Sequence, residues 1–239
     1  MKESIYTIPI SEVFEPKDGC PICRLRDTLE KRSIEYIMGA AMMEPDVRIE
    51  TNKQGFCTEH FNMMLKQRNR LSIALILESH LAYIQKEMFN KKDTFNKKEG
   101  LFKSKEKKKT PVEELSDSCY VCNQIDWAMK RMYETIFKLW AKEESFRELY
   151  SQQPVICLEH YAELSSMAVE KLGKKQAPEF LEVTEKLSKK YLDEVQADVS
   201  HFCKMFDYRN AGPNADWGNS RDSIERAIWY LTSRKPDEQ

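Results

Sequence analysis

The sequence predicts an all-α protein made of two similar helical units and a C-terminal helix. Glycine is scarce, at 7 of 239 residues, while Glu, Lys, Leu and Met are abundant, and this mixture favours helices. Apolar residues recur at spacings of three and four over long stretches, as they do on one face of an α-helix. A pattern of cysteine and histidine also occurs twice, roughly a hundred residues apart, which indicates an internal duplication.

The first unit is expected over residues 1–90. Its first apolar stripe comprises Leu25, Leu29, Tyr36, Ile37 and Ala40. Its second apolar stripe comprises Met64, Leu65, Leu71, Leu75, Leu81, Ile84 and Met88. The first stripe predicts one helix, and the second predicts either one long helix or two helices joined near Asn69. The alternation from Ile5 to Ile10 is the one candidate strand.

A lysine-rich segment at residues 91–111 separates the two units. From Asn90 to Lys109 the chain carries nine lysines, three acidic residues and few apolar ones. Such a segment suits a solvated linker, or a basic tether for phosphate or an acidic partner. Tethers usually interleave aromatic residues or arginines, and this segment has only Phe95 and Phe102. We therefore expect a linker.

The second unit is expected over residues 112–206, followed by a tail at 207–239. Its first apolar stripe comprises Cys122, Ile125, Met129, Met132, Ile136 and Leu139. Its second comprises Phe180, Val183, Leu187, Tyr191, Val195, Phe202 and Phe206. The two stripes predict two long helices, the second entered after Pro178. A last helix opens near Ser220, with Asn219 or Ser220 as its N-cap and Asp222 in its first turn.

The two units align with one inserted residue. At an offset of 99 residues, the identical pairs are Arg32 and Arg131, Glu35 and Glu134, Ile37 and Ile136, Glu44 and Glu143, and Arg48 and Arg147. At an offset of 100, they are Cys57 and Cys157, Glu59 and Glu159, and His60 and His160. Because these identities keep their order and need a single gap, we interpret them as a duplication.

The aligned cysteines and histidines form a metal-ligand pattern. The first copy comprises Cys20, Cys23, Cys57 and His60, and the second comprises Cys119, Cys122, Cys157 and His160. Each copy joins a CxxC to a CxxH element, and zinc takes such ligands in a tetrahedron. We expect two zinc ions, one in a Cys3His site of each copy. A swapped arrangement, in which the CxxC of one copy joins the CxxH of the other, stays open.

The ligand set favours structural zinc, because four protein ligands leave no coordination position for water or substrate. An iron–sulfur cluster held by three cysteines and one histidine is the main alternative. A redox dithiol at Cys20 and Cys23 fits less well, because such a pair needs no histidine and usually follows a strand.

The other candidate residues are expected to be structural. Glu59 and Glu159 occupy the same place in both CxxH elements, where an acid suits the positive end of a helix. A carboxylate that assists the metal is the alternative for these two residues. We expect His80 to be a packed or surface histidine. Cys203 lies two residues from His201, a poor spacing for chelation on a helix, and is expected to be a buried apolar side chain.

The tail carries a polar and aromatic cluster. It comprises Asp207, Tyr208, Arg209, Trp217, Arg221 and Asp222. We expect Trp217 and an Arg–Asp network to lock the tail onto the helical body. The alternative is a pocket in which Arg209 or Arg221 receives an anionic ligand.

Composition narrows the class of protein. The formal net charge of −1 provides no overall field that attracts nucleic acid or an anionic membrane. The N-terminal residues lack the apolar run of a signal peptide and no stretch is apolar enough to span a bilayer, so we expect a cytoplasmic protein with reduced cysteines. No Ser/His/Asp set, phosphate-binding glycine loop or HExxH helix indicates an enzyme class, and whether the protein is an enzyme stays open.

Three segments carry a resemblance to a known family. They read CPIC at residues 20–23, GFCTEH at 55–60, and FDYRN at 206–210 followed by DWGNSRD at 216–222. With them the chain resembles an uncharacterised bacterial family of unknown function from the Firmicutes. The resemblance implies a bacterial cytoplasmic protein and supplies no activity. The second copy departs from the pattern at Tyr120, Pro154, Val155 and Ile156, which replace Pro21, Gln54, Gly55 and Phe56.

The sequence therefore predicts a zinc-binding helical protein of unknown biochemical role. The simplest role is a non-enzymatic binding or adaptor protein with structural zinc sites and an unknown protein partner. The near-neutral charge disfavours nucleic acid as that partner. The alternative is a metal- or redox-responsive protein, or an enzyme, that uses one Cys3His zinc or iron–sulfur site chemically.

Overall fold

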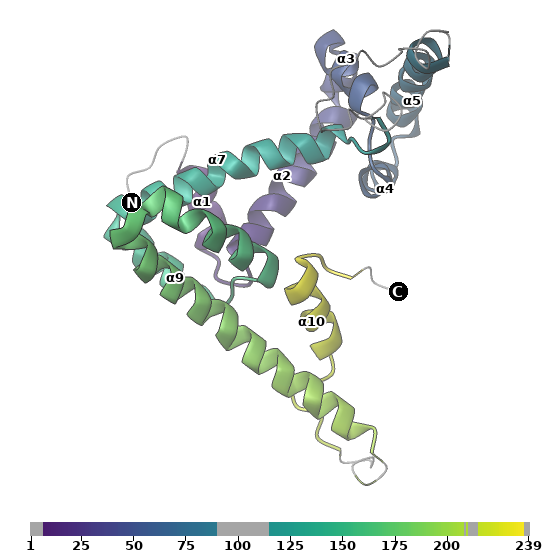
Figure 1. Cartoon of the computed structure of the whole chain (residues 1–239). Coiled ribbons are helices and arrows are strands. Elements are labelled where there is room, and N and C mark those ends of the chain that lie inside the picture. Colours follow the sequence, from purple (N-terminus) through teal and green to yellow (C-terminus); the bar gives the residue numbers. More distant parts are fainter. Residues whose placement is uncertain (1–6, 90–114, 208, 210–214, 237–239) are drawn as a thin grey trace, which may run out of the picture. The chain divides into compact units, whose positions relative to one another are not determined.

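The computed structural model describes residues 7–89, 115–207, 209 and 215–236, and these are mainly helical (Figure 1). No strand occurs among them, which confirms the all-α prediction. The first helix, α1 (Ile8–Phe14), occupies part of the stretch that alternated from Ile5 to Ile10, so the candidate strand was wrong. The predicted linker at 91–111 lies outside the described residues. None of the described helices is both long and apolar enough to cross a membrane.

The chain divides into two compact units, and each draws on separate parts of the sequence. One unit comprises residues 1–27 and 129–239, and the other comprises residues 28–128. Two long helices, α2 (Pro21–Met38) and α7 (Tyr120–Lys142), begin in one unit and continue into the other. The domain boundaries given above from the sequence stay a prediction.

The unit of residues 1–27 and 129–239 has an aromatic core. The ring centroids of Trp140 and Phe180 lie 5.0 Å apart, and that of Tyr150 lies 5.3 Å and 5.2 Å from them. Phe14 of α1 and Phe146 of α8 (Glu144–Ser151) extend this stack. All five rings are buried. Aromatic rings bury large apolar areas, so this stack forms a main part of the core of this unit.

The longest helix of this unit, α9 (Leu158–Met205), bends sharply at Gly173. The φ of Gly173 is +68°, which side chains disfavour and glycine accepts. Its second segment therefore follows Gly173, and Pro178, the predicted entry point, lies inside the helix. The last helix, α10 (Ser223–Thr232), packs on this second segment, where the Tyr230 hydroxyl lies 2.8 Å from Ser188 Oγ. Its N-cap is Asp222 rather than Asn219 or Ser220.

The unit of residues 28–128 consists of short helices between the long ones. They are η1 (Ala40–Met43), α3 (Pro45–Gln54), α4 (Thr58–Lys66), α5 (Arg70–Ile84) and the π-helix η2 (Gln85–Phe89). The predicted joint near Asn69 is confirmed, since its side chain accepts a hydrogen bond from the Ser72 N–H at 3.2 Å. Gly55 is the C-cap of α3, and its φ of +61° turns the chain toward α4.

Candidate metal centres

Each predicted ligand pair lies at the N-terminus of a helix. Cys20 precedes α2, Cys57 precedes α4, Cys119 precedes α7 and Cys157 precedes α9. The carbonyl oxygen of each of these cysteines accepts a hydrogen bond from the N–H four residues later, at 2.8–3.2 Å. The second ligand of each pair, three residues on, therefore lies one turn later on the same face. The positive end of each helix also stabilises a thiolate there.

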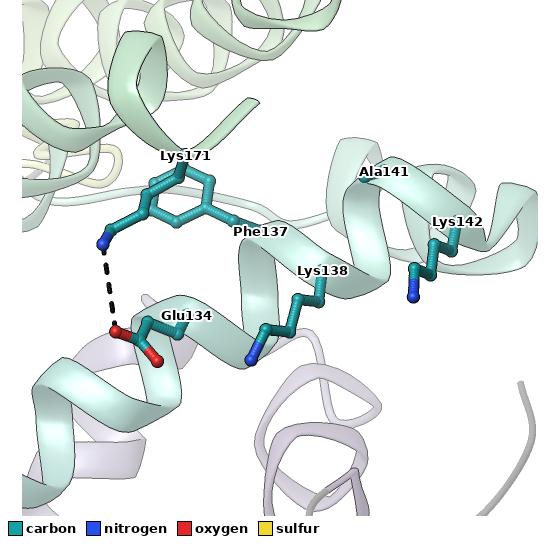
Figure 2. A pocket seen from close by; sticks show the side chains of 6 residues that line it. All are labelled: Glu134, Phe137, Lys138, Ala141, Lys142 and Lys171. Carbon is teal, nitrogen blue, oxygen red and sulfur yellow. Dashed lines mark ion pairs between the residues drawn. The ribbon is translucent and has the colours of Figure 1, made fainter. Parts of the chain in front are cut away.

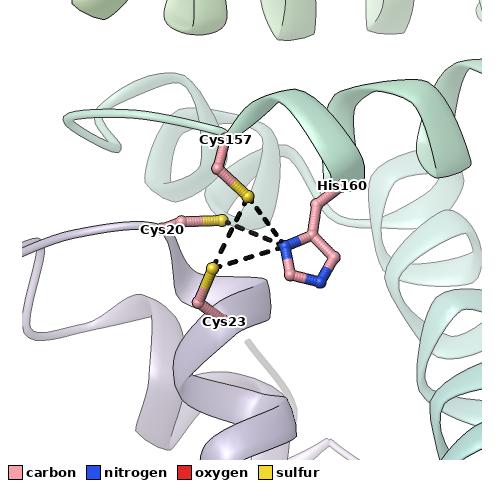
Figure 3. Close-up of side chains that lie close together, drawn as sticks. All are labelled: Cys20, Cys23, Cys157 and His160. Atoms are coloured by element: carbon pink, nitrogen blue, oxygen red, sulfur yellow. Dashed lines mark hydrogen bonds between the residues drawn. The ribbon is translucent and has the colours of Figure 1, made fainter. Parts of the chain in front are cut away.

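Cluster A comprises Cys20, Cys23, Cys157 and His160, all of them buried. His160 directs Nδ1 at the three sulfurs, as Figure 3 shows, at 3.0 Å from Cys157, 3.4 Å from Cys23 and 3.7 Å from Cys20. The sulfurs of Cys23 and Cys157 lie 3.5 Å apart. Cluster A thus joins the N-termini of α2 and α9 in one compact donor set.

Cluster B comprises Cys57, His60, Cys119 and Cys122, and joins the N-termini of α4 and α7. The Nδ1 of His60 lies 3.0 Å from the sulfur of Cys57, 3.2 Å from that of Cys119 and 3.5 Å from that of Cys122. His60 and Cys119 are buried, whereas Cys57 and Cys122 are only partly buried. Cluster B is therefore the more accessible of the two.

The expected grouping of the ligands is wrong. We expected Cys20 and Cys23 to share an ion with Cys57 and His60, but they lie with Cys157 and His160. The swapped arrangement, which the sequence had left open, is the one that the structure adopts. The spacing of ligands along a chain does not determine which helix termini meet.

Both clusters fit a tetrahedral metal ion better than a disulfide. With zinc–sulfur bonds of about 2.3 Å, two sulfurs of a tetrahedron lie about 3.8 Å apart. The observed separations are 3.5 Å for Cys23 and Cys157 and 4.0 Å for Cys57 and Cys122. A disulfide would need about 2.05 Å. In each cluster the four ligand atoms lie within 4.8 Å of one another, so each can hold one metal ion.

The ionisable groups of cluster A differ widely in pKa. Hydrogen bonds from Cys20, Cys23 and His160 hold the pKa of the Cys157 thiol far below its ordinary value. Hydrogen bonds to Cys157 and Cys20, together with burial, raise the pKa of Cys23. Burial opposes charge on His160, but its hydrogen bonds to Cys157 and Cys20 outweigh burial and raise the imidazole pKa to about 10. The Cys157 sulfur is thus the anionic centre of cluster A.

Cluster B shows the same pattern around Cys119. Burial opposes the Cys119 thiolate, but the hydrogen bond from His60 lowers the pKa of this thiol to about 6. Burial also opposes charge on His60, but hydrogen bonds to Cys119 and Glu30 raise its pKa to about 10. Burial and the nearby Cys119 thiolate raise the pKa of Cys122. A divalent cation replaces such shared protons when it binds, so metal binding here releases protons.

A backbone contact explains why the two copies differ around their ligands. In cluster B the Tyr120 N–H donates to the Gly55 carbonyl at 3.0 Å, which ties the CxxC to the CxxH segment. In cluster A the corresponding positions are Pro21 and Val155, and proline has no N–H to donate. Pro21 instead begins α2, where a missing N–H is tolerated.

Two residues that contact the ligands were missed by the sequence analysis. Glu30, which is 4% exposed, places Oε1 3.0 Å from His60 Nε2 in cluster B. Ser233 places its hydroxyl 2.9 Å from Cys157 Sγ in cluster A. Glu30 occupies a buried position four residues before Ile34, so an acid within an apolar stripe was the available signal. Ser233 lies beyond the predicted apolar face of the last helix and gave no signal.

The other predicted residues have structural contacts. Glu59 and Glu159 lie in the first turns of α4 and α9, as expected. Glu159 also lies 3.5 Å from the guanidinium of Arg26. His80 is buried, with Nδ1 2.9 Å from the Asn52 carbonyl, which confirms the packed histidine. Cys203 is exposed, so its predicted burial was wrong: its side chain lies on the solvent side of α9.

The tail is attached to α9 largely as predicted. Trp217 packs against Phe202 of α9 and against Phe206, the C-cap of that helix, and Arg221 lies 5.4 Å from the centre of the Trp217 ring. The Arg–Asp bridge to α9, however, comes from Arg226, 2.9 Å from Asp198. Arg226 also lies 3.0 Å from Asp222, and Arg209 pairs with Asp207. Tyr208 and residues 210–214 lie outside the described residues.

A surface hollow on α7 and α9 offers a weaker candidate site (Figure 2). It is lined by Glu134, Phe137, Lys138, Ala141, Lys142 and Lys171. Lys171 lies 3.8 Å from Glu134 and 3.1 Å from Glu170, so part of the positive charge is already neutralised. Among these six residues, the buried one is Phe137, whose ring is apolar, and the arrangement indicates no particular ligand.

Comparison with known proteins identifies a family and no activity. No curated protein and no solved structure matches the chain. One family model, described as a family of unknown function (DUF6062), matches residues 1–238. Because this match covers nearly the whole chain, the protein belongs to the family of unknown function DUF6062.

Proposed function

We propose that the protein binds two zinc ions, one in cluster A and one in cluster B, and that both ions are structural. The single observation that carries this proposal is the approach of four ligand atoms to within 4.8 Å of one another in each cluster. Three thiolates and one imidazole complete a tetrahedron, so no position is left for substrate. Structural zinc contributes on the order of 10–16 kcal/mol of binding free energy that is coupled to folding.

Metal content and the visible spectrum test this proposal. The purified protein should contain two zinc ions per chain and be colourless. An iron–sulfur protein would absorb visible light and contain iron and sulfide. Cys203→Ser is the matched control, because Cys203 belongs to neither cluster, and it should retain both ions. A folded protein that retains no zinc when purified with zinc present would contradict the proposal.

We further propose that zinc serves to fix a helical scaffold for a protein partner, in the manner of a non-enzymatic adaptor in a bacterial cytoplasm. The cysteines at the four helix termini bind metal only as reduced thiolates, and the cytoplasm keeps cysteines reduced, which supports this location. The clusters hold together chain segments far apart in the sequence, since Cys23 and His160 are 137 positions apart. Removal of zinc with a chelator should therefore unfold the protein, as measured by circular dichroism, and abolish partner binding.

A metal- or redox-responsive role for cluster B is the second candidate. It is favoured by the partial exposure of Cys57 and Cys122, which contrasts with the fully buried ligands of cluster A. An alkylating agent should then modify Cys57 and Cys122 and release one zinc ion while the helical content is retained. Loss of both ions, or unfolding on loss of the first, would instead favour two structural sites.

A further inference from the structure

Glu30 is a buried carboxylate that contacts the candidate ligand His60 at the ring nitrogen that faces away from the sulfurs of cluster B. It lies in the third turn of α2 and is 4% exposed, although α2 has exposed positions on its other faces. Its Oε1 lies 3.0 Å from Nε2 of His60, which is 1% exposed. Burial of a carboxylate is unfavourable unless a partner satisfies it. The imidazole of His60 is such a partner.

The contact fixes which nitrogen of His60 keeps its proton when a metal ion binds. A carboxylate oxygen accepts hydrogen bonds, so Nε2 must donate to Glu30. Nδ1 is then the nitrogen that gives up its proton and offers a lone pair when a metal ion binds, and it faces all three sulfurs of cluster B at 3.0–3.5 Å. A carboxylate behind a histidine ligand also makes the imidazole a stronger donor and holds the ring in place.

Cluster A has no such carboxylate at the corresponding position. At the offset of 99 that aligns the two copies, Glu30 corresponds to Met129, which is also buried. Within the described part of the chain, the hydrogen bonds of His160 all run through Nδ1. Cluster A is supported instead by Ser233, whose hydroxyl contacts Cys157. The two clusters therefore have different surroundings.

We propose that Glu30 is a positioning residue of cluster B, which orients His60 as an Nδ1 ligand and strengthens the binding of one of the two metal ions. The proposal rests on the proposed zinc sites and adds to them a residue that does not touch the metal. It also provides cluster B, whose ligands are less buried, with a means of retaining its ion.

Three variants test whether the carboxylate of Glu30 itself strengthens metal binding in cluster B. Glu30→Met removes the acceptor, keeps a similar volume and reproduces the residue of cluster A. Glu30→Gln keeps an acceptor but removes the charge. Glu59→Gln is the control, since Glu59 is an exposed acid one residue from His60. Release of zinc to a chelator should show one ion unchanged in every variant, and one released roughly 10- to 100-fold faster in Glu30→Met, less so in Glu30→Gln.

Nitrogen-15 NMR of the imidazoles keeps the test decisive if Glu30→Met does not fold. In the zinc-loaded wild-type protein, His60 should carry its proton on Nε2, shifted downfield by the carboxylate, and bind metal through Nδ1. Glu30→Gln should move this proton upfield, and Glu59→Gln should not. A His60 ring bound through Nε2, or equal release in Glu30→Met and Glu59→Gln, would overturn the inference alone. A wild-type protein without zinc would overturn the proposed function itself.

Discussion

The hydroxyl oxygen of Ser233 lies 2.9 Å from the sulfur of Cys157, and this contact joins the C-terminal segment to cluster A. Ser233 follows α10 directly as its C-cap, with a φ of +56°. Its carbonyl oxygen accepts a hydrogen bond from Arg26, three residues after Cys23 on α2. The end of α10 is thus held by both helices that supply the ligands of cluster A, α2 and α9.

Replacement of Ser233 by alanine should weaken this attachment. The variant loses a hydrogen bond to a buried sulfur, so the free energy of unfolding should fall by about 1 kcal/mol. Urea denaturation measures this loss, and hydrogen exchange should show faster exchange of the α10 amides. Thr232→Ala is the matched control, because the hydrogen bonds of the Thr232 hydroxyl run to exposed backbone groups nearby, the carbonyls of Ile228 and Arg234 and the N–H of Arg234. Equal effects of the two variants would show that the contact with Cys157 adds no stability.

Gly55→Ala should destabilise the unit of residues 28–128, because alanine disfavours the backbone conformation of Gly55 and its methyl group would crowd His80. The φ of Gly55 is +61°, and an added Cβ would lie 3.0 Å from His80 Nε2. Strain of this kind amounts to about 1–3 kcal/mol. Gly173→Ala is the control, since Gly173 has a φ of +68° but open space around an added Cβ. Urea denaturation should show the larger loss for Gly55→Ala, and a larger loss for Gly173→Ala would contradict the role of His80.

Cys203 should be the only thiol that reacts rapidly in the zinc-loaded protein. It is exposed, whereas the other six cysteines lie in the two clusters. Because a metal-bound thiolate is held by its ion, brief treatment with a maleimide should label one cysteine per chain, and Cys203→Ser should abolish this labelling. All seven cysteines should react once the protein is unfolded in a denaturant that also contains a chelator. Rapid labelling of all six remaining cysteines in the folded Cys203→Ser protein would show that the clusters hold no metal, whereas labelling of Cys57 and Cys122 alone would favour the responsive role of cluster B.

The sequence predicted the helices and the ligand residues better than their arrangement. Ligand spacing of three residues at a helix N-terminus is a local property, so the pairs beginning at Cys20 and Cys157 were recognisable separately. Their meeting in cluster A depends on the course of whole helices, which local spacing does not encode. Glu30 was missed for a related reason, because an acid is ordinarily exposed and only the three-dimensional packing places it behind His60.

The break in α9 shows a similar limit. Pro178 is the usual marker of a helix boundary in a sequence, yet the helix continues through it. Gly173 is the actual break, because its positive φ excludes a regular helix at that point. Cys203 was wrongly placed in the core since free cysteines are mostly buried, and its position on the outer side of α9 depends on the packing of that helix.

Zinc stoichiometry in paired variants tests the swapped ligand sets most directly. Cys20→Ser with Cys157→Ser removes two ligands of cluster A only, whereas Cys20→Ser with Cys57→Ser removes one ligand from each cluster. Native mass spectrometry should find one tightly bound zinc ion in the first double variant and none in the second. The reverse result, with one ion retained in the Cys20 and Cys57 double variant and none in the other, would show that each copy binds its own ion and would contradict the swapped arrangement.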